Sequence, residues 1–182
     1  MAKTEDLDRL VRKPICSAAK ALERVPPKPG YYTIFIDSPG ELPSPFSKLL
    51  VQRKTKLIYI GIATRSLYQR LIEQDLFHKK ASTFFRGIGA ILNFRPPVGS
   101  LVGKRNQNNY RFNPADTKEI ISWIQHHLRV GWIKEDPALE TEESRLIKKH
   151  CPIINTEYNP NPVPELASLR SECRTLACSR KA

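Results

Sequence analysis

The stretch KTKLIYIGIATRSLYQRL, residues 54–71, joins a strand pattern directly to a helix pattern. Its first half predicts a strand, because apolar residues alternate there with a period of two. Tyr59 is expected on one face of this strand, and the opposite face is expected to carry Ile58, Ile60 and Ile62. This strand is the element around which the rest of the fold is built.

The second half of the stretch predicts a helix over residues 67–76. Ser66 precedes it and can cap it, since its hydroxyl can accept a hydrogen bond from an otherwise unpaired first-turn N–H. At about 100° per residue the apolar side chains form one arc, and Arg70 falls outside that arc. The strand and the helix therefore bring Tyr59 and Arg70 close together along the chain.

Upstream, the segment YYTIFID at residues 31–37 predicts a second strand, again by its period of two. Tyr32 shares one face with Ile34 and Ile36, and the proline-rich loop at 38–48 connects the two strands as a long hairpin. Residues 5–24 read as two short amphipathic helices broken at Pro14, which pack on the core as an N-terminal extension.

Downstream, Ser82 is placed to cap a shorter helix, and a long basic loop rich in Pro, Gly and Asn follows over residues 93–114. The remaining pattern predicts a helix over 115–128, a short strand over 129–134 and a helix over 137–150. We expect an α+β fold with a small three-stranded antiparallel sheet flanked by helices. The expected divisions are an N-terminal helical extension, a central domain and a loosely attached C-terminal tail, at residues 1–28, 29–158 and 159–182.

Positive charge is concentrated in one part of the chain. The net charge is +12, and between Leu42 and Ala115 thirteen basic residues face only two acidic ones, Glu73 and Asp75. Such a one-signed block indicates a surface for a polyanion, although a basic protein tuned for solubility would also show an excess of positive charge. The candidates for nucleic-acid contacts are Lys79, Lys80, Arg86, Lys104, Arg105 and Arg111.

The composition argues against a membrane or exported protein. No apolar run approaches the length of about 18 residues that a membrane helix needs, and the charged N-terminus lacks the apolar stretch of a secretory signal. The four cysteines are scattered without a paired spacing and are expected to be reduced thiols. We therefore expect a cytoplasmic protein, and the sequence makes no prediction of an oligomeric state.

One carboxylate faces inward on the helix predicted over residues 137–150. Glu143 falls within the apolar stripe that contains Leu146 and Ile147. A charge in that position needs a cation or hydrogen bonds to receive it. A hard divalent ion such as Mg²⁺ would serve, and a salt bridge to a lysine or arginine is the alternative.

Four short motifs occur in an order that resembles the GIY-YIG nuclease superfamily. They are GYY at residues 30–32, YIG at 59–61, LxxR ending at Arg70, and ExxLIKKHxPxxN at 143–155. The resemblance spans roughly residues 29–156. It implies the same layout of a hairpin, helices, a third strand and a late helix that carries the glutamate.

The resemblance also implies roles for single residues. Tyr59 would position or deprotonate the attacking water with Tyr32 in support, and Arg70 would pair with the scissile phosphate. Glu143 would bind one divalent metal, Mg²⁺ or Mn²⁺, and Asn155 would steady the site. These roles suit phosphodiester hydrolysis, which needs an oriented nucleophile, charge neutralisation and a metal near the leaving oxygen.

The chain departs from the family pattern at two positions. Ile62 stands where the excision-repair incision subunit of the family carries a lysine, and Gln74 stands where other members have tyrosine or histidine. His78, two helical turns beyond Arg70, is a candidate replacement for the general base, and a surface histidine in a basic run is the alternative.

The resulting expectation is a divalent-metal-dependent endonuclease that acts on DNA, of a restriction or repair type. Two other functions stay open: a catalytically weak nucleic-acid-binding module on the same fold, and a nuclease that acts on RNA, because phosphate contacts carry no information about the sugar.

Overall fold

A computed structural model describes residues 4–135 and 141–180 of the chain. Its centre is an antiparallel sheet of four strands in the order β1-β4-β2-β3. The strands are β1 (Cys16–Ser17), β2 (Gly30–Ile36), β3 (Leu57–Ala63) and β4 (Leu128–Lys134). The predicted antiparallel sheet is confirmed, but it has four strands in place of three, because two residues of the N-terminal extension pair with β4.

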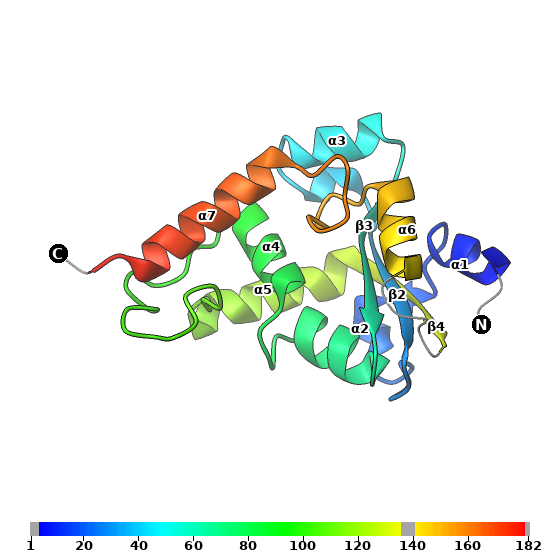
Figure 1. Ribbon diagram of the computed structural model, residues 1–182, viewed down its shortest axis with the longest axis horizontal. Coiled ribbons are helices and arrows are strands. Elements are labelled where there is room, and N and C mark those ends of the chain that lie inside the picture. Colours follow the sequence, from blue (N-terminus) through cyan, green and yellow to red (C-terminus); the bar gives the residue numbers. More distant parts are fainter. Residues whose placement is uncertain (1–3, 136–140, 181–182) are drawn as a thin grey trace.

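Helices cover both faces of the sheet. α4, α5 and α7 lie on one side, and α1 and α6 lie on the other (Figure 1). The helical segments are α1 (Thr4–Leu10), α2 (Ala18–Ala21), η1 (Pro39–Glu41), α3 (Phe46–Gln52), η2 (Tyr68–Leu76), α4 (Thr83–Ile91), α5 (Pro114–His127), α6 (Thr141–His150) and α7 (Pro164–Cys178). The first predicted N-terminal helix is therefore present as α1, and the second is reduced to the four residues of α2.

The central strand β2 is buried along its whole length. Its residues Tyr32, Ile34 and Ile36 belong to the larger hydrophobic cluster, on the side of α4 and α5. Tyr31 and Phe35 belong to a smaller cluster, to which α1 and α6 also contribute. The face assignment predicted for this strand from its period of two is thus correct.

The edge strand β3 contains an irregularity that its sequence pattern conceals. Ile34 pairs with Tyr59 while Phe35 pairs with Leu57, so Ile58 has no partner across the strand. An extra residue of this kind forms a β-bulge, which turns two consecutive side chains to one face. Ile58 and Tyr59 therefore both enter the larger cluster, and the prediction that Ile58 shares a face with Ile60 is wrong.

Two segments predicted to be irregular are ordered and packed. The proline-rich loop contains α3, whose Phe46 and Leu50 are buried. The segment expected to be a loose C-terminal tail instead forms α7, which packs on α4 and buries Leu166 and Cys173. The apolar residues of α7 recur with a helical period, so the sequence itself indicates a helix there.

Two other predictions concern the long basic loop and the last predicted helix. The predicted long loop is present between α4 and α5, and Leu101, Tyr110 and Phe112 anchor it in the larger cluster. The last predicted helix is described from Thr141, and its predicted start, in 136–140, lies outside the described residues. No helix within the described residues is both long and apolar enough to cross a membrane.

Candidate active site

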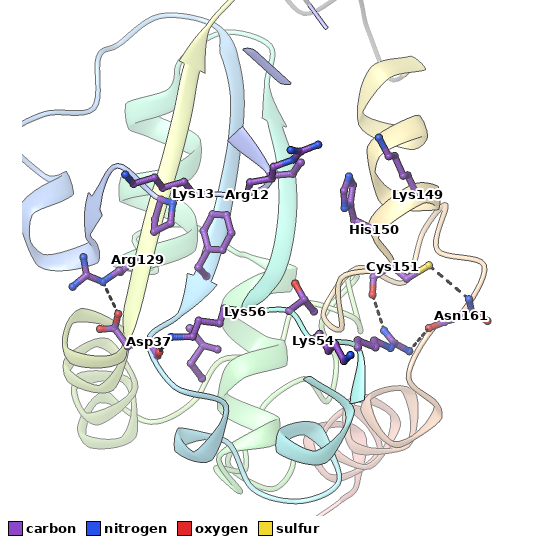
Figure 2. A pocket seen from close by; sticks show the side chains of 16 residues that line it. Arg12, Lys13, Asp37, Lys54, Lys56, Arg129, Lys149, His150, Cys151 and Asn161 are labelled. Carbon is purple, nitrogen blue, oxygen red and sulfur yellow. Dashed lines mark hydrogen bonds and ion pairs between the residues drawn. The ribbon is translucent and has the colours of Figure 1, made fainter. Parts of the chain in front are cut away.

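A large cavity lies away from the residues predicted to be functional. It has a volume of about 980 Å³ and is rich in basic side chains, including Arg12, Lys13, Lys54 and Lys149 (Figure 2). Asp37, the one acidic residue in the described part of the lining, is paired with Arg129 at 2.5 Å. None of the predicted site residues lines this cavity, so its size alone does not make it the active site.

A smaller pocket, called here the active-site pocket, brings four predicted residues together. Tyr59 comes from β3, Arg70 from η2, Glu143 from α6, and Asn155 from the segment after α6. The pocket has a volume of about 300 Å³. Its other lining residues are Ile62, Thr83, Ile147, Ile154, Thr156, Glu157 and Tyr158.

Arg70 is held by a helix of unusual width. η2 is a π-helix, in which hydrogen bonds run over five residues, as from Phe77 N–H to the Ile72 carbonyl. This winding brings Asp75, five residues further on, to the same side of the helix as Arg70, and their Nη1 and Oδ1 atoms lie 2.5 Å apart. The predicted helix is confirmed in extent, and its π-winding was not predicted.

Asp75 is the centre of a buried polar network that the sequence interpretation missed. Its side chain is fully buried and accepts hydrogen bonds from Tyr32 Oη at 2.5 Å and from Ser82 Oγ at 2.6 Å, besides the contact with Arg70. Burial raises the pKa of this carboxyl, and Arg70 and the two hydroxyl donors act in the opposite direction. A signal was present, because Asp75 is one of only two acidic residues in the basic block.

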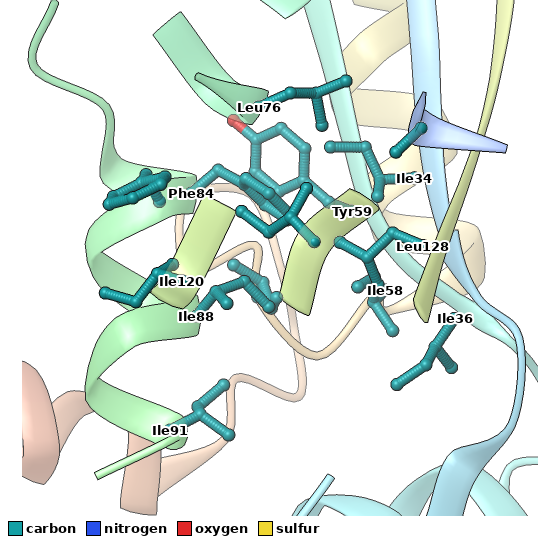
Figure 3. Packing of buried hydrophobic residues seen from close by; sticks show 14 of the residues in the cluster. Ile34, Ile36, Ile58, Tyr59, Leu76, Phe84, Ile88, Ile91, Ile120 and Leu128 are labelled. Carbon is teal, nitrogen blue, oxygen red and sulfur yellow. The ribbon is translucent and has the colours of Figure 1, made fainter. Parts of the chain in front are cut away.

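The two hairpin tyrosines take different positions. Tyr32 is fully buried and donates to Asp75, while Tyr59 lines the pocket, with 6.1 Å between the ring centroids. Figure 3 shows Tyr59 among apolar side chains, where its ring packs on Phe84 with centroids 5.2 Å apart. Burial, followed by the Asp75 carboxylate, raises the pKa of Tyr59, so this residue is a neutral phenol in the free protein.

Asn155 fastens the segment after α6 to the edge of the sheet. Its Oδ1 accepts from the Ile60 N–H at 2.9 Å, and its Nδ2 donates to the Ile60 carbonyl at 2.8 Å. The Ile154 N–H donates to the Ile58 carbonyl at 3.0 Å beside it. Asn155 therefore holds one wall of the pocket against the strand that carries Tyr59.

Glu143 is the pocket residue best suited to hold a divalent cation. It is half-buried and shares the pocket with a second carboxylate, Glu157. Among the described residues no three side chains of the His, Cys, Asp or Glu type gather as a metal site. Mg²⁺ suits such a pocket, since it binds through one or two carboxylates and completes its shell with water and phosphate oxygens.

His78 is not brought to the pocket. Its ring stacks on Phe85 with centroids 4.2 Å apart, and within the described part of the chain neither ring nitrogen has a hydrogen-bond partner. Burial, with smaller contributions from Arg111 and Arg86, lowers the pKa of His78 to about 4. Its position in the core gives no support to the expectation that it replaces the general base, and it is not the surface histidine of the alternative either.

The predicted nucleic-acid contacts fall into three places. Lys79 and Lys80 are exposed after η2, and Lys79 pairs with Glu73. The long loop and the start of α5 form a hollow of about 650 Å³, lined in part by Lys104, Arg105 and Arg111. Arg86 is different, since it is buried with its guanidinium over the Tyr110 ring, and it lines another hollow beside the active-site pocket.

Comparisons with known proteins give one result. The sequence matches the family model described as the GIY-YIG catalytic domain over residues 30–176, which is more than half of the 182-residue chain. The matched region contains every residue of the active-site pocket and nearly all of α7. No curated protein and no solved structure matches the chain.

Proposed function

The chain belongs to the GIY-YIG catalytic domain family, and on that premise we propose that it is a divalent-metal-dependent endonuclease that hydrolyses phosphodiester bonds in DNA. The observation that carries the proposal is the convergence of Tyr59, Arg70 and Glu143 on one pocket from three separate elements. These side chains supply an oriented hydroxyl, a fixed guanidinium and a carboxylate, which are the groups that phosphodiester hydrolysis requires.

Arg70 binds the scissile phosphate in this proposal. Asp75 and Gln74 both contact its Nη1, so the guanidinium is oriented while its side chain stays 29% exposed toward the pocket. A fixed guanidinium fork can bind two phosphate oxygens at once without further ordering. Asp75 is therefore a positioning residue for Arg70.

Tyr59 orients the attacking water through its hydroxyl. Because this phenol is neutral in the free protein, we assign it to hydrogen bonding with the water rather than to removing a proton in the resting state. Glu143 would hold the divalent ion, which when bound stabilises negative charge on the phosphate oxygens. Asn155 keeps the pocket wall in register with Tyr59 by its two hydrogen bonds to Ile60.

A second candidate function is nucleic-acid binding without efficient cleavage. Ile62 favours it, because this apolar side chain lines the pocket at a position where a lysine would add a further proton donor. The two candidates share the basic surface and the fold, and they differ in whether a bond is broken.

The proposal is tested with supercoiled plasmid incubated with purified protein and Mg²⁺, and in parallel with chelator. We expect nicked or linear product only when metal is present. A second pair of incubations uses single-stranded DNA and RNA of the same sequence, and faster cleavage of RNA would replace DNA as the proposed substrate. Binding to plasmid with no product in either condition would reject the enzyme in favour of the binding module.

A further inference from the structure

We propose that a second phosphate-binding site, called here the arginine notch, adjoins the active-site pocket and takes a phosphate that flanks the scissile one on the same strand. The notch is the hollow of about 330 Å³ between α4 and α7. Its polar lining residues are Thr83, Arg86, Asn108, Tyr110, Thr156, Arg170 and Arg174. The inference rests on the proposed function, because it adds a contact to the same substrate.

The notch and the active-site pocket share a wall. Thr83 and Thr156 line both hollows. Thr83 is the first residue of α4, and Arg86 stands one turn further along the same helix. A strand whose phosphate lies at Arg70 therefore passes over this wall and reaches Arg86 and Arg170 with its next phosphates.

Two guanidinium groups in the notch have no anionic partner among the residues that the structure describes. Arg86 is only 9% exposed, its Nη1 has no hydrogen-bond partner, and its Nη2 reaches only the Thr83 hydroxyl at 3.5 Å. Arg170 has an unpaired Nε and makes only long contacts, of 3.3–3.4 Å, to two carbonyls and the Thr156 hydroxyl. Neither forms an ion pair with a carboxylate within residues 4–135 and 141–180.

A buried cation without a counter-ion destabilises a fold, because it loses hydration and gains no opposite charge. Burial lowers the pKa of the buried Arg86 and of the half-buried Arg170, which agrees with this lack of compensation. The nearby Arg95 shows the ordinary arrangement, since it forms a two-pronged ion pair with Glu172 of α7 at 3.0 and 3.1 Å. The same helix therefore supplies a carboxylate to Arg95 and none to the notch.

A glycine on α4 makes room for the second arginine. A Cβ atom at position 87 would lie 2.8 Å from Nη2 of Arg170. Glycine within a helix costs about 1 kcal/mol relative to alanine, so local helix stability does not explain its presence there. Gly87 lets the guanidinium of Arg170 lie against α4, beside Arg86.

The ligand that fits these features is a phosphodiester. Planar guanidinium forks match the oxygens of a phosphate, and three arginines around one hollow favour an anion with several acceptor oxygens. The Tyr110 ring lies under Arg86, with 5.6 Å from the guanidinium carbon to the ring centroid, and so restricts the orientation of that fork.

The test measures binding of a labelled DNA duplex by fluorescence anisotropy, in chelator and over a range of salt. Arg86→Gln and Arg170→Gln are each expected to make the slope of log K against log salt less steep by about 0.9, the value for one lost phosphate contact. Arg95→Gln is the matched control, because it removes the same charge from an arginine that already has a carboxylate partner. Slopes equal to that of Arg95→Gln in both notch variants would overturn the proposal.

Thermal unfolding separates binding from a structural role. Removal of an unpaired buried cation leaves the melting temperature of Arg86→Gln unchanged or raises it, whereas a fall of many degrees would assign Arg86 to the fold and overturn its part in the notch. Gly87→Ala keeps every charge and displaces Arg170, so it is expected to weaken DNA binding with no loss of helix stability. Unaltered binding in Gly87→Ala would overturn the part assigned to Arg170.

Plasmid cleavage by the wild-type protein distinguishes failure of the notch from failure of the proposed function. If the wild-type protein binds without cutting and the notch variants flatten the salt slope, the enzyme is rejected while the notch stands as a phosphate site. If the wild-type protein cuts and the notch variants match Arg95→Gln, the notch is rejected while the enzyme stands.

Discussion

Residues that do not line the active-site pocket hold its side chains in position. Arg70 is oriented by Asp75, and Asp75 is in turn held by Tyr32 and Ser82. Tyr32 donates to Oδ2 of this buried carboxylate, and Ser82 and Arg70 donate to Oδ1, so both of its oxygens are hydrogen-bonded. The arginine is thus fixed before any phosphate arrives.

The first prediction concerns the shape of that arginine. Arg70→Lys keeps the positive charge but loses the fork, so the cleavage rate should fall by about 10²-fold or more, as for other single groups that stabilise developing charge. Most of the DNA affinity should survive, because twelve other basic residues remain in the block. Arg65→Lys, an exposed residue outside the pocket, is the control in the same plasmid assay. Equal rates in the two variants would remove Arg70 from the site.

Glu143 gives a second prediction. Glu143→Gln keeps the size of the side chain and removes its charge, so metal-dependent cleavage should fall by several orders of magnitude. DNA affinity in chelator should be retained or increased, because one negative charge near the phosphate is gone. Cleavage is measured over a Mg²⁺ titration, with Glu142→Gln as the neighbouring control. Full activity at the ordinary Mg²⁺ concentration would contradict the assignment of the metal to Glu143.

A third prediction follows from His78. Its pKa is lowered to about 4 in the folded protein, so the unfolded chain binds one proton more between that value and the ordinary pKa of about 6.5. The free energy of unfolding is therefore not reduced by His78 above pH 6.5, and it falls as the pH is lowered toward 4. The decrease over that pH window is about 3 kcal/mol.

Urea unfolding at several pH values tests this prediction. His78→Phe keeps an aromatic ring against Phe85 and should remove this part of the pH dependence, whereas His126→Phe on the exposed surface should leave it in place. An identical loss of stability on acidification in wild type and His78→Phe would show that His78 is not its source.

Among the elements, the β2–β3 hairpin depends on close approach between its strands. Gly61 pairs with Tyr32, and a Cβ atom at position 61 would lie 2.5 Å from the Tyr32 ring and hydroxyl. The glycine of the YIG motif therefore gives the buried tyrosine room to reach Asp75. Packing against Tyr32 therefore requires a glycine at this position of the motif, in addition to any role of the motif in the site.

The fourth prediction tests this cause. Gly61→Ala should lower the free energy of unfolding by about 1–3 kcal/mol, the usual cost of overpacking a core, and should also slow cleavage because Tyr32 moves away from Asp75. Gly40→Ala is the control, since a Cβ atom there meets only the Ser38 hydroxyl at 3.8 Å. Chemical denaturation of both variants gives the comparison. Equal stability in the two would refute the packing explanation.

The elements also show why some features could be predicted and others could not. Strand β2 and helices α4 and α5 have strong periodic patterns and clear caps, such as Ser82 accepting from the Phe85 N–H, so their prediction is correct. The bulge at Ile58 has no local signature, because it is a feature of the pairing between β3 and β2. The π-winding of η2 was not predicted either, since the apolar arc of that segment fits an ordinary helix. The expected loose C-terminal tail contains no helix, so the arginines that α7 brings to the notch are not predicted.

At the scale of the whole molecule, positive charge is concentrated where the long loop between α4 and α5 meets the helices. Lys104, Arg105 and Arg111 line one hollow, and Asn108 and Tyr110 of the same loop line the notch. Opposite charges are scarce over this region of the sequence, so the field there favours a polyanion over long range.

The fifth prediction is that DNA binding without metal depends steeply on salt through this surface. Replacement of Lys104, Arg105 and Arg111 by Gln should flatten the salt slope by up to about 0.9 for each residue that contacts a phosphate. The control triple is Lys20, Arg24 and Lys28, which are exposed and lie outside the basic block. A slope that does not change, or that changes equally in both triples, would show that the loop does not track the phosphate backbone.

The attachment of Asn155 to β3 has a consequence for self-association. An edge strand offers unpaired N–H and carbonyl groups on which another chain can add a strand and begin an aggregate. Ile154 and Asn155 occupy three of these groups, at Ile58 and Ile60, with hydrogen bonds of their own. One side chain thus shapes the pocket and also blocks growth of the sheet. Loss of Asn155 would expose backbone groups of the edge strand to pairing with another chain. An inactive Asn155 variant therefore has to be shown monodisperse before its inactivity is assigned to the chemistry of the site.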